Sequence, residues 1–284
     1  MDLIHLVYQQ TYLTQLRQAI LQEAIEGKLT ADWRIKNPVQ KGNPNFDATA
    51  LLEQIKAEKQ RLITEGKIKK DKPLATINPD DVPFALPNGW VWVRLGDLTE
   101  LITSGSRDWA IYYKDEGRAK FVRMGNLSHD WFDLKNNKIQ MVEPPKSEGT
   151  RTSLIENDLL NSITGDIGWK ALIPKDFGEG YINQHTALVR FTNLLRGKFF
   201  PIILCSPFSK KQFNAPQRGI KNSLRLGDIS EHLIALPPLA EQNAIVERVD
   251  RLLESVNTLE RQVTERKSYA QQLMQAVLKE AFAG

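Results

Sequence analysis

The sequence predicts an α+β protein, in which a mixed α/β domain is followed by a long helix that forms a coiled coil. Three observations lead to this prediction. Short strand-like runs alternate with turns in the middle of the chain, a heptad pattern without Gly or Pro occupies its C-terminal part, and one helical segment occurs at both ends. The chain has 284 residues, of which 41% are hydrophobic, and can therefore bury a sizeable core.

The N-terminal part, residues 1–88, is predicted to be helical and to end in a linker. A first helix is expected over about 3–26, because Gly27 follows its last apolar residue as a natural C-terminal cap. A second amphipathic helix is expected over about 48–65. The lysine-rich run 67–73 that follows is typical of an exposed linker.

Residues 89–236 are predicted to form the mixed domain. The strand-like runs are 91–95, 120–123, 139–142, 158–163, 169–173, 187–191 and 233–236. One helix is expected over 200–213. Short strands of this kind, separated by turns and accompanied by a helix, are typical of an α+β domain.

Residues 237–284 are predicted to form one long coiled-coil helix. Apolar residues recur at alternating spacings of four and three from Ile245 to Val277, and only Arg266 interrupts them. A helix over 240–281 would be roughly 60 Å long at about 1.5 Å per residue. One small domain cannot cover so long a stripe, so another long helix is expected as its partner.

That partner is predicted to be a second copy of the chain, in a two-fold homodimer held together by the long helix. The residues expected in this interface are Leu13, Leu16, Ile20, Val249, Leu252, Val256, Leu259, Val263, Leu273 and Val277. Helices of a different partner protein are the alternative cover for the same stripe.

The repeated segment consists of residues 12–27 and 269–284. The two copies align without gaps, and nine of their sixteen positions are identical, including Tyr12 with Tyr269 and Gly27 with Gly284. A repeat confined to the two ends is not a solenoid. We interpret the chain as one structural unit that starts and stops at copies of the same C-terminal helix segment. Residues 12–27 are therefore a candidate to take the place of the equivalent segment in a neighbouring unit.

The charge permits nucleic-acid binding without requiring it. The net charge is +4 and the isoelectric point about 9.0. From residue 205 to 226 the chain carries five basic residues and no acidic one. Cys205, the single cysteine, lies in an apolar run and is interpreted as a packing residue. With no long apolar run and no signal peptide visible, a cytoplasmic location is expected.

No catalytic constellation is visible in the sequence. We find no phosphate-binding glycine loop, no metal-ligand spacing among the four histidines, no nuclease-like acidic cluster and no nucleophile elbow. The chain is therefore predicted to be non-catalytic, with no cofactor and no metal.

Four segments resemble, in the same order, the specificity subunits of type I restriction-modification systems. They are residues 86–96, which contain Leu-Pro-Asn-Gly-Trp, then 161–168, then 183–185, and finally 236–242, which read Leu-Pro-Pro-Leu-Ala-Glu-Gln. The resemblance implies a DNA-reading subunit in which a mixed α/β recognition domain is carried on a long helix, and in which the long helices form an antiparallel coiled coil. Its implied partners are double-stranded DNA, methyltransferase subunits and restriction subunits. A complete subunit of this family has two recognition domains, so this chain resembles one half. The alternatives are a coiled-coil interaction scaffold and a fragment of a fused restriction enzyme.

The DNA-contacting residues are nominated by their chemistry, because the recognition domain is where the family varies. The candidates are Ser104, Gly105, Ser106, Arg107, Arg123, Asn126, Thr164, Gly165, Asp166, Lys170, Asn183, Gln184, His185, Lys210, Arg218 and Lys221. Residues 104–107 are expected to be a flexible loop, and 164–170 a turn near a phosphate or base. Arginine suits guanine in the major groove, and asparagine or glutamine suits adenine. Asn183 and His185 have a second interpretation as internal hydrogen-bond partners.

Overall fold

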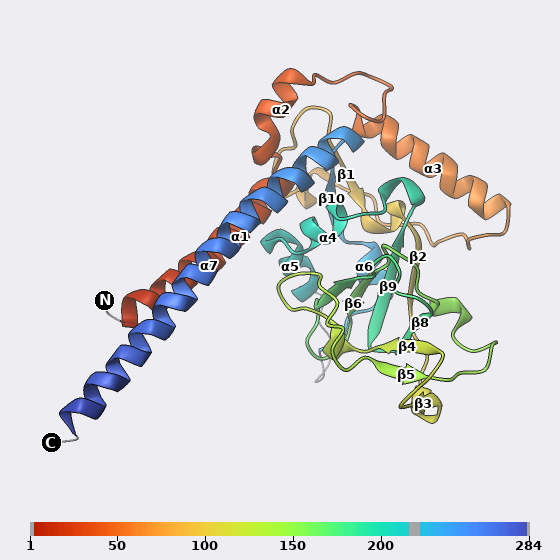
Figure 1. The fold of residues 1–284 in the computed structure, drawn as a ribbon. Helices are drawn as coiled ribbons and strands as arrows, with labels where there is room; N and C mark the ends of the chain where they lie inside the picture. The colour runs from red at the N-terminus through yellow and green to blue at the C-terminus, as the bar shows by residue number, and fades with distance from the viewer. Residues whose placement is uncertain (1–2, 216–221, 283–284) are drawn as a thin grey trace.

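The computed structural model describes residues 3–215 and 222–282. A pair of long helices lies along one side of a mixed domain, which is built from three small sheets and short helices (Figure 1). Two further helices lie at one end of the helix pair. The predicted α+β class is confirmed.

The helix pair consists of α1 (Leu3–Ile25) and α7 (Leu239–Ala281). The two run antiparallel, so both ends of the chain lie at the same end of the pair (Figure 1). Arg17 of α1 fixes their register through two hydrogen bonds to the Glu260 carboxylate of α7, at 3.1 and 2.6 Å. The predicted antiparallel coiled coil is therefore formed within one chain.

This pairing changes the expected interface with a second copy. Leu13, Ile20, Val249, Val256 and Val263 are buried within the chain, and so they are not available to a partner. The other nominated residues stay exposed: Leu16 by 44%, Leu252 by 39%, Leu259 by 45%, Leu273 by 67% and Val277 by 56%. The heptad pattern contains two apolar rows, and only the row that includes Val249 and Val256 faces α1 and the mixed domain.

The first helix copy also packs differently from the expectation that it completes a neighbouring unit. In α1, Leu21, Ala24 and Ile25 are buried in the core of their own chain. The repeated residues at the end of α7 have no such cover, and Leu278, the counterpart of Leu21, is 49% exposed. The two copies of the repeat therefore occupy different surroundings.

Between the pair and the mixed domain the chain forms η1 (Lys28–Thr30), α2 (Ala31–Lys36) and α3 (Ala48–Thr64). The helix predicted over 48–65 is confirmed, whereas α2 was not expected. The side chain of Asp47 caps α3 by accepting from the backbone N–H of Thr49 at 3.0 Å.

A buried carboxylate, Glu241, ties these parts together near the start of α7. It accepts from Thr30 Oγ1 at 2.6 Å, from Trp90 Nε1 at 2.7 Å, and from the guanidinium of Arg34. Glu241 is 1% exposed. The N-terminal segment, the start of the mixed domain and the long helix therefore share one hydrogen-bonded cluster, which we call the Glu241 cluster.

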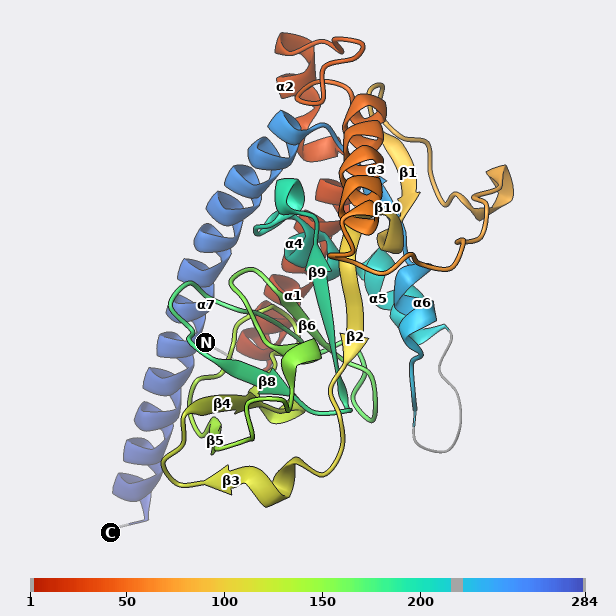
Figure 2. The same cartoon turned by 90° about the vertical axis from the view of Figure 1, so that its right-hand side faces the viewer.

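The strands of the mixed domain form three sheets (Figure 2). The first pairs β1 (Val91–Arg94) with β10 (Leu233–Leu236). The second has the order β2 (Thr99–Ser104), β9 (Thr186–Phe191), β6 (Leu159–Ser162) and β7 (Lys170–Leu172). The third has the order β3 (Tyr113–Lys114), β5 (Gln140–Val142), β4 (Ala119–Val122) and β8 (Gly180–Ile182). Pairing is antiparallel except between β4 and β8. The strands β2, β3 and β8 were not expected from the sequence.

The single helix expected over 200–213 is two helices, α4 (Phe199–Leu204) and α5 (Pro207–Asn214). Ser206 ends the first and caps the second by accepting from the N–H of Ser209 at 3.2 Å, with Pro207 in the first turn. Helix α6 (Leu226–Ser230) precedes β10. The remaining 3-10 turns are η2 (Pro79–Asp81), η3 (Leu95–Leu98), η4 (Trp109–Tyr112), η5 (Met124–Asn126), η6 (Thr150–Thr152) and η7 (Asn193–Leu195).

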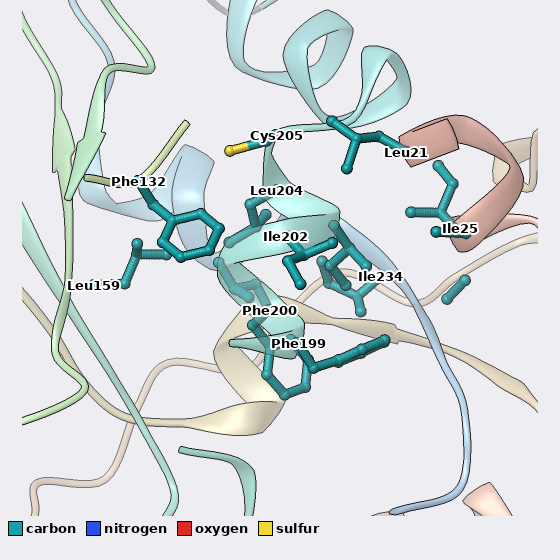
Figure 3. Packing of buried hydrophobic residues seen from close by; sticks show 14 of the residues in the cluster. Leu21, Ile25, Phe132, Leu159, Phe199, Phe200, Ile202, Leu204, Cys205 and Ile234 are labelled. Atoms are coloured by element: carbon teal, nitrogen blue, oxygen red, sulfur yellow. The ribbon is translucent and has the colours of Figure 1, made fainter. Parts of the chain in front are cut away.

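The main core lies where α4 is enclosed between the helix pair and the second sheet. Leu21 and Ile25 approach α4 from one side, and Phe132 and Leu159 from the other (Figure 3). Cys205 lies at the end of α4 and is 1% exposed, which confirms it as a packing residue. Burial raises the pKa of its thiol. Among the described helices, none has the length and apolar character to span a membrane.

Candidate nucleic-acid interface

A cleft of about 870 Å³ opens in the mixed domain. Its lining consists of Arg123, Met124, Gly125, Asn126, Lys135, Asn137, Lys138, Thr164, Gly165, Asn183, His185 and Asn222. Six of these residues were nominated from the sequence as DNA contacts, namely Arg123, Asn126, Thr164, Gly165, Asn183 and His185. The fold therefore brings together residues that lie far apart along the chain.

The ends of three strands place the nominated residues at the cleft. Strands β4 and β8 are parallel neighbours in which Val122 is paired with Ile182, so Arg123 and Asn183 leave the sheet side by side. Thr164 and Gly165 form the turn that follows β6, and Gly165 donates its N–H to the carbonyl of Asn222 at 3.0 Å.

The cleft is positively charged. Among its described lining residues, three are cations and none is a carboxylate. Arg123 lies over the ring of Tyr113 at 5.8 Å, and Lys135 lies over the ring of Trp169 at 5.0 Å. Lys138 is exposed. None of the three cations forms an ion pair within the described residues, so their charges remain available to an anionic partner.

One wall of the cleft is held by side-chain hydrogen bonds. The side-chain oxygen of Asn183 accepts from the N–H of His185 and from Thr186 Oγ1, both at 3.2 Å. The two ring nitrogens of His185 contact Thr164 Oγ1 at 2.8 Å and the amide nitrogen of Gln184 at 2.9 Å. Asn183 and His185 thus form hydrogen bonds within the domain, as their second interpretation expects, and both also line the cleft.

Asn126 lines the cleft, but its side chain is buried and hydrogen-bonded within the domain. It is 5% exposed, its side-chain oxygen accepts from the N–H of Arg123 at 3.0 Å, and its amide nitrogen donates to the carbonyl of Lys135 at 3.2 Å. Both functions of the amide are used by the backbone. This residue shapes the loop that carries the cations.

The expectation for Lys170 is also corrected. Its side chain is buried, and its ammonium donates to the carbonyl of Gly168 at 2.7 Å and lies 4.8 Å from the ring of Phe213. Burial lowers the pKa of this lysine.

His232 is a second buried titratable group near Lys170. Its ring forms a hydrogen bond with the hydroxyl of Ser209 at 3.0 Å. Burial, with a smaller effect from Lys170, lowers the pKa of His232 to about 3.

The residues 104–107 do not form the expected flexible loop. Ser104 belongs to β2, and Gly105 packs so tightly on the backbone of Ile182 and Asn183 that a Cβ atom there would overlap it. Ser106 accepts from Trp109 Nε1 at 2.9 Å. Only Arg107, which follows, is exposed.

The remaining nominated residues lie away from the cleft lining. Asp166 is exposed on the turn after β6, Gln184 contributes through its contact with His185, and Lys210 on α5 forms an ion pair with Asp130 at 3.0 Å. Arg218 and Lys221 lie outside the described residues.

Sequence reasoning missed six lining residues: Met124, Gly125, Lys135, Asn137, Lys138 and Asn222. A signal for three of them was present, because residues 135–138 read Lys-Asn-Asn-Lys, a short run of cations and amides in front of β5. Asn222 carried no signal of its own, since only its pairing with the turn after β6 brings it to the cleft.

The chain resembles known specificity subunits over most of its length. It is 30% identical over 253 residues to the type I restriction enzyme EcoAI specificity subunit of Escherichia coli, a match that covers 86% of this chain and 40% of that protein. It is 27% identical over 256 residues to the EcoEI specificity subunit of Escherichia coli, covering 83% and 39%. The chain thus spans about two fifths of the length of these curated relatives.

Solved structures share the fold. The HsdS subunit from Thermoanaerobacter tengcongensis superposes with a TM-score of 0.53 at 20% identity, covering 98% of this chain and 59% of that one. A chain of a type I R-M system superposes with a TM-score of 0.58 at 19% identity, covering 97% and 59%. A family model described as the type I restriction modification DNA specificity domain matches residues 87–266, the region that contains the cleft and most of α7. The chain belongs to this family of type I restriction modification DNA specificity domains.

Proposed function

We propose that this chain binds double-stranded DNA and reads one part of a bipartite site for a type I restriction-modification complex. The cleft is the observation that carries the proposal, because its three cations have no carboxylate partner among the described residues and face the same space as several amides. Cations supply phosphate affinity, and amides are suited to base edges. Family membership supports the same role.

Each part of the chain has a task in this proposal. Residues 89–236 recognise DNA, residues 237–284 hold that domain at a fixed distance from the rest of the complex, and residues 1–88 supply α1, which packs along the long helix. The Glu241 cluster makes these parts one body. The chain itself carries no catalysis and needs no cofactor, and methyltransferase and restriction subunits supply the reactions.

Modification mapping tests this proposal. The chain would be co-expressed with a methyltransferase subunit from its own genome, and methylated positions would be mapped across the host DNA. We expect one bipartite motif that disappears when the chain is omitted. Methylation of the same motif without the chain would refute the proposal. The purified chain alone, given magnesium, ATP and S-adenosylmethionine, is expected to leave a plasmid uncut and unmethylated.

Salt-dependent binding separates this function from that of a coiled-coil scaffold. A phosphate-binding surface loses affinity steeply as salt rises, with a slope in log–log form of about −0.9 per phosphate contacted. We expect a labelled duplex of random sequence to bind at low salt and to dissociate as the salt concentration rises. A chain that assembles with its partner subunits but binds no duplex would favour the scaffold.

We also propose that the chain forms a homodimer through the exposed apolar face of α7. The end of this helix exposes Tyr269, Leu273, Met274, Val277 and Leu278, each by 49% or more. Each large apolar side chain left in water forgoes roughly 1.5–3 kcal/mol of burial. Antiparallel contact between two copies would cover these residues and place one recognition domain at each end.

Sedimentation of paired variants tests the dimer. The double variant Leu273→Asp with Val277→Asp should sediment as a monomer at micromolar concentration, whereas the wild type sediments as a dimer. The matched variant Gln271→Asp places a charge on an exposed polar position of the same helix and should leave the dimer intact. A wild-type monomer, even when bound to methyltransferase subunits, would contradict the proposal.

A further inference from the structure

Four asparagine side chains line the cleft, and they differ in which of their polar groups remain free. Adenine presents an acceptor, N7, and a donor, the N6 amino group, in the major groove of DNA. An asparagine reads it by donating from Nδ2 and accepting at Oδ1 at the same time. Only an amide with both groups free can make this paired contact.

Two of the four asparagines fail this requirement. Asn126 uses both amide groups on the backbone, accepting at 3.0 Å from Arg123 and donating at 3.2 Å to Lys135. Asn183 uses its side-chain oxygen to accept from His185 and Thr186. It retains only a donor, which cannot by itself distinguish adenine from guanine, because both bases carry the N7 acceptor.

Asn137 and Asn222 meet the requirement. Both are exposed, and neither side-chain amide forms a hydrogen bond to a described residue. Asn222 is fixed through its backbone, since its carbonyl accepts from Gly165 at 3.0 Å. Asn137 precedes Lys138, whose φ of 63° is left-handed and turns the chain sharply at this point. Each amide is thus carried on a turn at the cleft and is not used by any hydrogen bond among the described residues.

The cations beside them suit a different task. Arg123 and Lys135 are each held over an aromatic ring, at 5.8 and 5.0 Å. With Lys138, they supply positive charge at the cleft without any carboxylate in its described lining. Charge of this kind attracts phosphates of every sequence, so it holds DNA without selecting it.

We propose that Asn137 and Asn222 are specificity-determining residues, each of which reads one adenine in the half-site that this chain recognises. The inference rests on the proposed function, because it requires DNA in the cleft. Neither residue was among the DNA contacts nominated from the sequence, whereas Asn126 and Asn183 were.

Selection from a random library tests the inference. The full-length chain would be incubated with duplexes that carry 30 randomised base pairs, and the bound fraction would be sequenced. The wild type should enrich a motif that contains adenine. Asn137→Ala and Asn222→Ala should each lose the preference at one adenine, by on the order of 5- to 150-fold, the range typical of one paired base contact, and keep the other positions.

A second substitution predicts a switch of specificity. Asn222→Asp removes the donor and leaves acceptors, which suit the N4 amino group of cytosine. The preference at that position should therefore move from adenine to cytosine. Asn136→Ala is the matched control, because Asn136 is exposed in the same loop but lines a neighbouring groove beside Lys120 and Lys175. It should leave the motif unchanged. All variants should keep the thermal unfolding midpoint of the wild type, because both amides are exposed.

The outcomes are distinct. The inference is overturned, and the proposed function is left intact, by variants that keep the preference for both adenines. The same holds for variants that weaken binding to every sequence equally, as the loss of a phosphate contact would. A wild-type chain that enriches no sequence overturns the proposed function and the inference with it. Loss of one adenine in each variant, with the control unchanged, supports both.

Discussion

The Glu241 cluster and the cleft both gather charged and polar side chains, but they satisfy them in opposite ways. Glu241 is 1% exposed, and its carboxylate accepts from three side chains of the same protein. In the cleft, three cations have no carboxylate partner among the described residues, and two amides form no hydrogen bond to a described residue. The polar groups of the Glu241 cluster have their hydrogen-bond partners within the protein, whereas the cations and the two amides of the cleft have none among the described residues and are accessible to a binding partner.

The largest effect is expected where a saturated group is removed. Glu241→Ala leaves the buried donors of Thr30 and Trp90, and the half-buried guanidinium of Arg34, without their acceptor, so the free energy of unfolding should fall by about 3–5 kcal/mol. Urea denaturation measures this change. Glu247→Ala, at an exposed position of the same helix, should change it by less than about 0.5 kcal/mol. Equal stability of the two variants would show that the cluster does not hold the parts together.

A smaller effect is expected from pH at the buried His232. Burial lowers its pKa to about 3 from an ordinary value of 6.5, so the unfolded chain takes up a proton between these pH values while the folded protein does not. The stability contributed by neutral His232 is therefore complete above pH 6.5 and is lost as the pH falls toward 3. By linkage the loss reaches about 2 kcal/mol at pH 5.

Urea denaturation between pH 7.5 and 5 measures this loss. His232→Gln removes the titrating group, so its free energy of unfolding should depend less on pH than that of the wild type. His129→Gln is the control, because His129 is exposed. If His232→Gln and the wild type lose the same stability between these pH values, the buried ring is not the source.

The open cations should affect binding and not folding. Lys138→Ala should weaken the binding of cognate and random duplexes alike, by about fivefold at 0.15 M salt. The slope of log affinity against log salt concentration should become shallower by about one phosphate contact. Fluorescence anisotropy across a salt series measures both quantities. Lys146→Ala, another exposed lysine, is the control. A stability loss in Lys138→Ala comparable to that of Glu241→Ala would erase the distinction between the two regions.

The smallest effect is expected at Lys210. Its ammonium already forms an ion pair with Asp130 at 3.0 Å, so it offers less charge to a phosphate than Lys138 does. Lys210→Ala should therefore weaken duplex binding by less than about twofold. The double variant Lys210→Ala with Asp130→Ala should bind like the wild type. A loss as large as that of Lys138→Ala would show that the ion pair opens when DNA binds.

The local sequence by itself determined the helices and most strands. Helix periodicity, Gly27 as a C-terminal cap and the absence of Gly and Pro between Pro238 and Gly284 are local signals, and they predicted α1, α3 and α7 within one or two residues. The strands β2, β3 and β8 were not predicted, because they are short or lack a clear alternation of apolar and polar residues. Their pairing with neighbouring strands defines them. Ser206 and Pro207 divided the expected single helix into α4 and α5 through a cap that the pattern of apolar residues does not reveal.

Only the tertiary structure decided which partner each apolar row and each polar side chain meets. The heptad pattern of α7 predicted a partner helix, but it did not identify α1 as that partner. The pattern contains two apolar rows of similar character, and the sequence does not show which of them faces a helix of the same chain. Asn126 and Asn222 are the same residue type, yet the side-chain amide of Asn126 is hydrogen-bonded to the backbone, whereas that of Asn222 forms no hydrogen bond to a described residue. The difference arises because loops distant in sequence surround the two residues differently. A sequence specifies the chemistry of a side chain, whereas its function depends on the neighbours that long-range packing supplies.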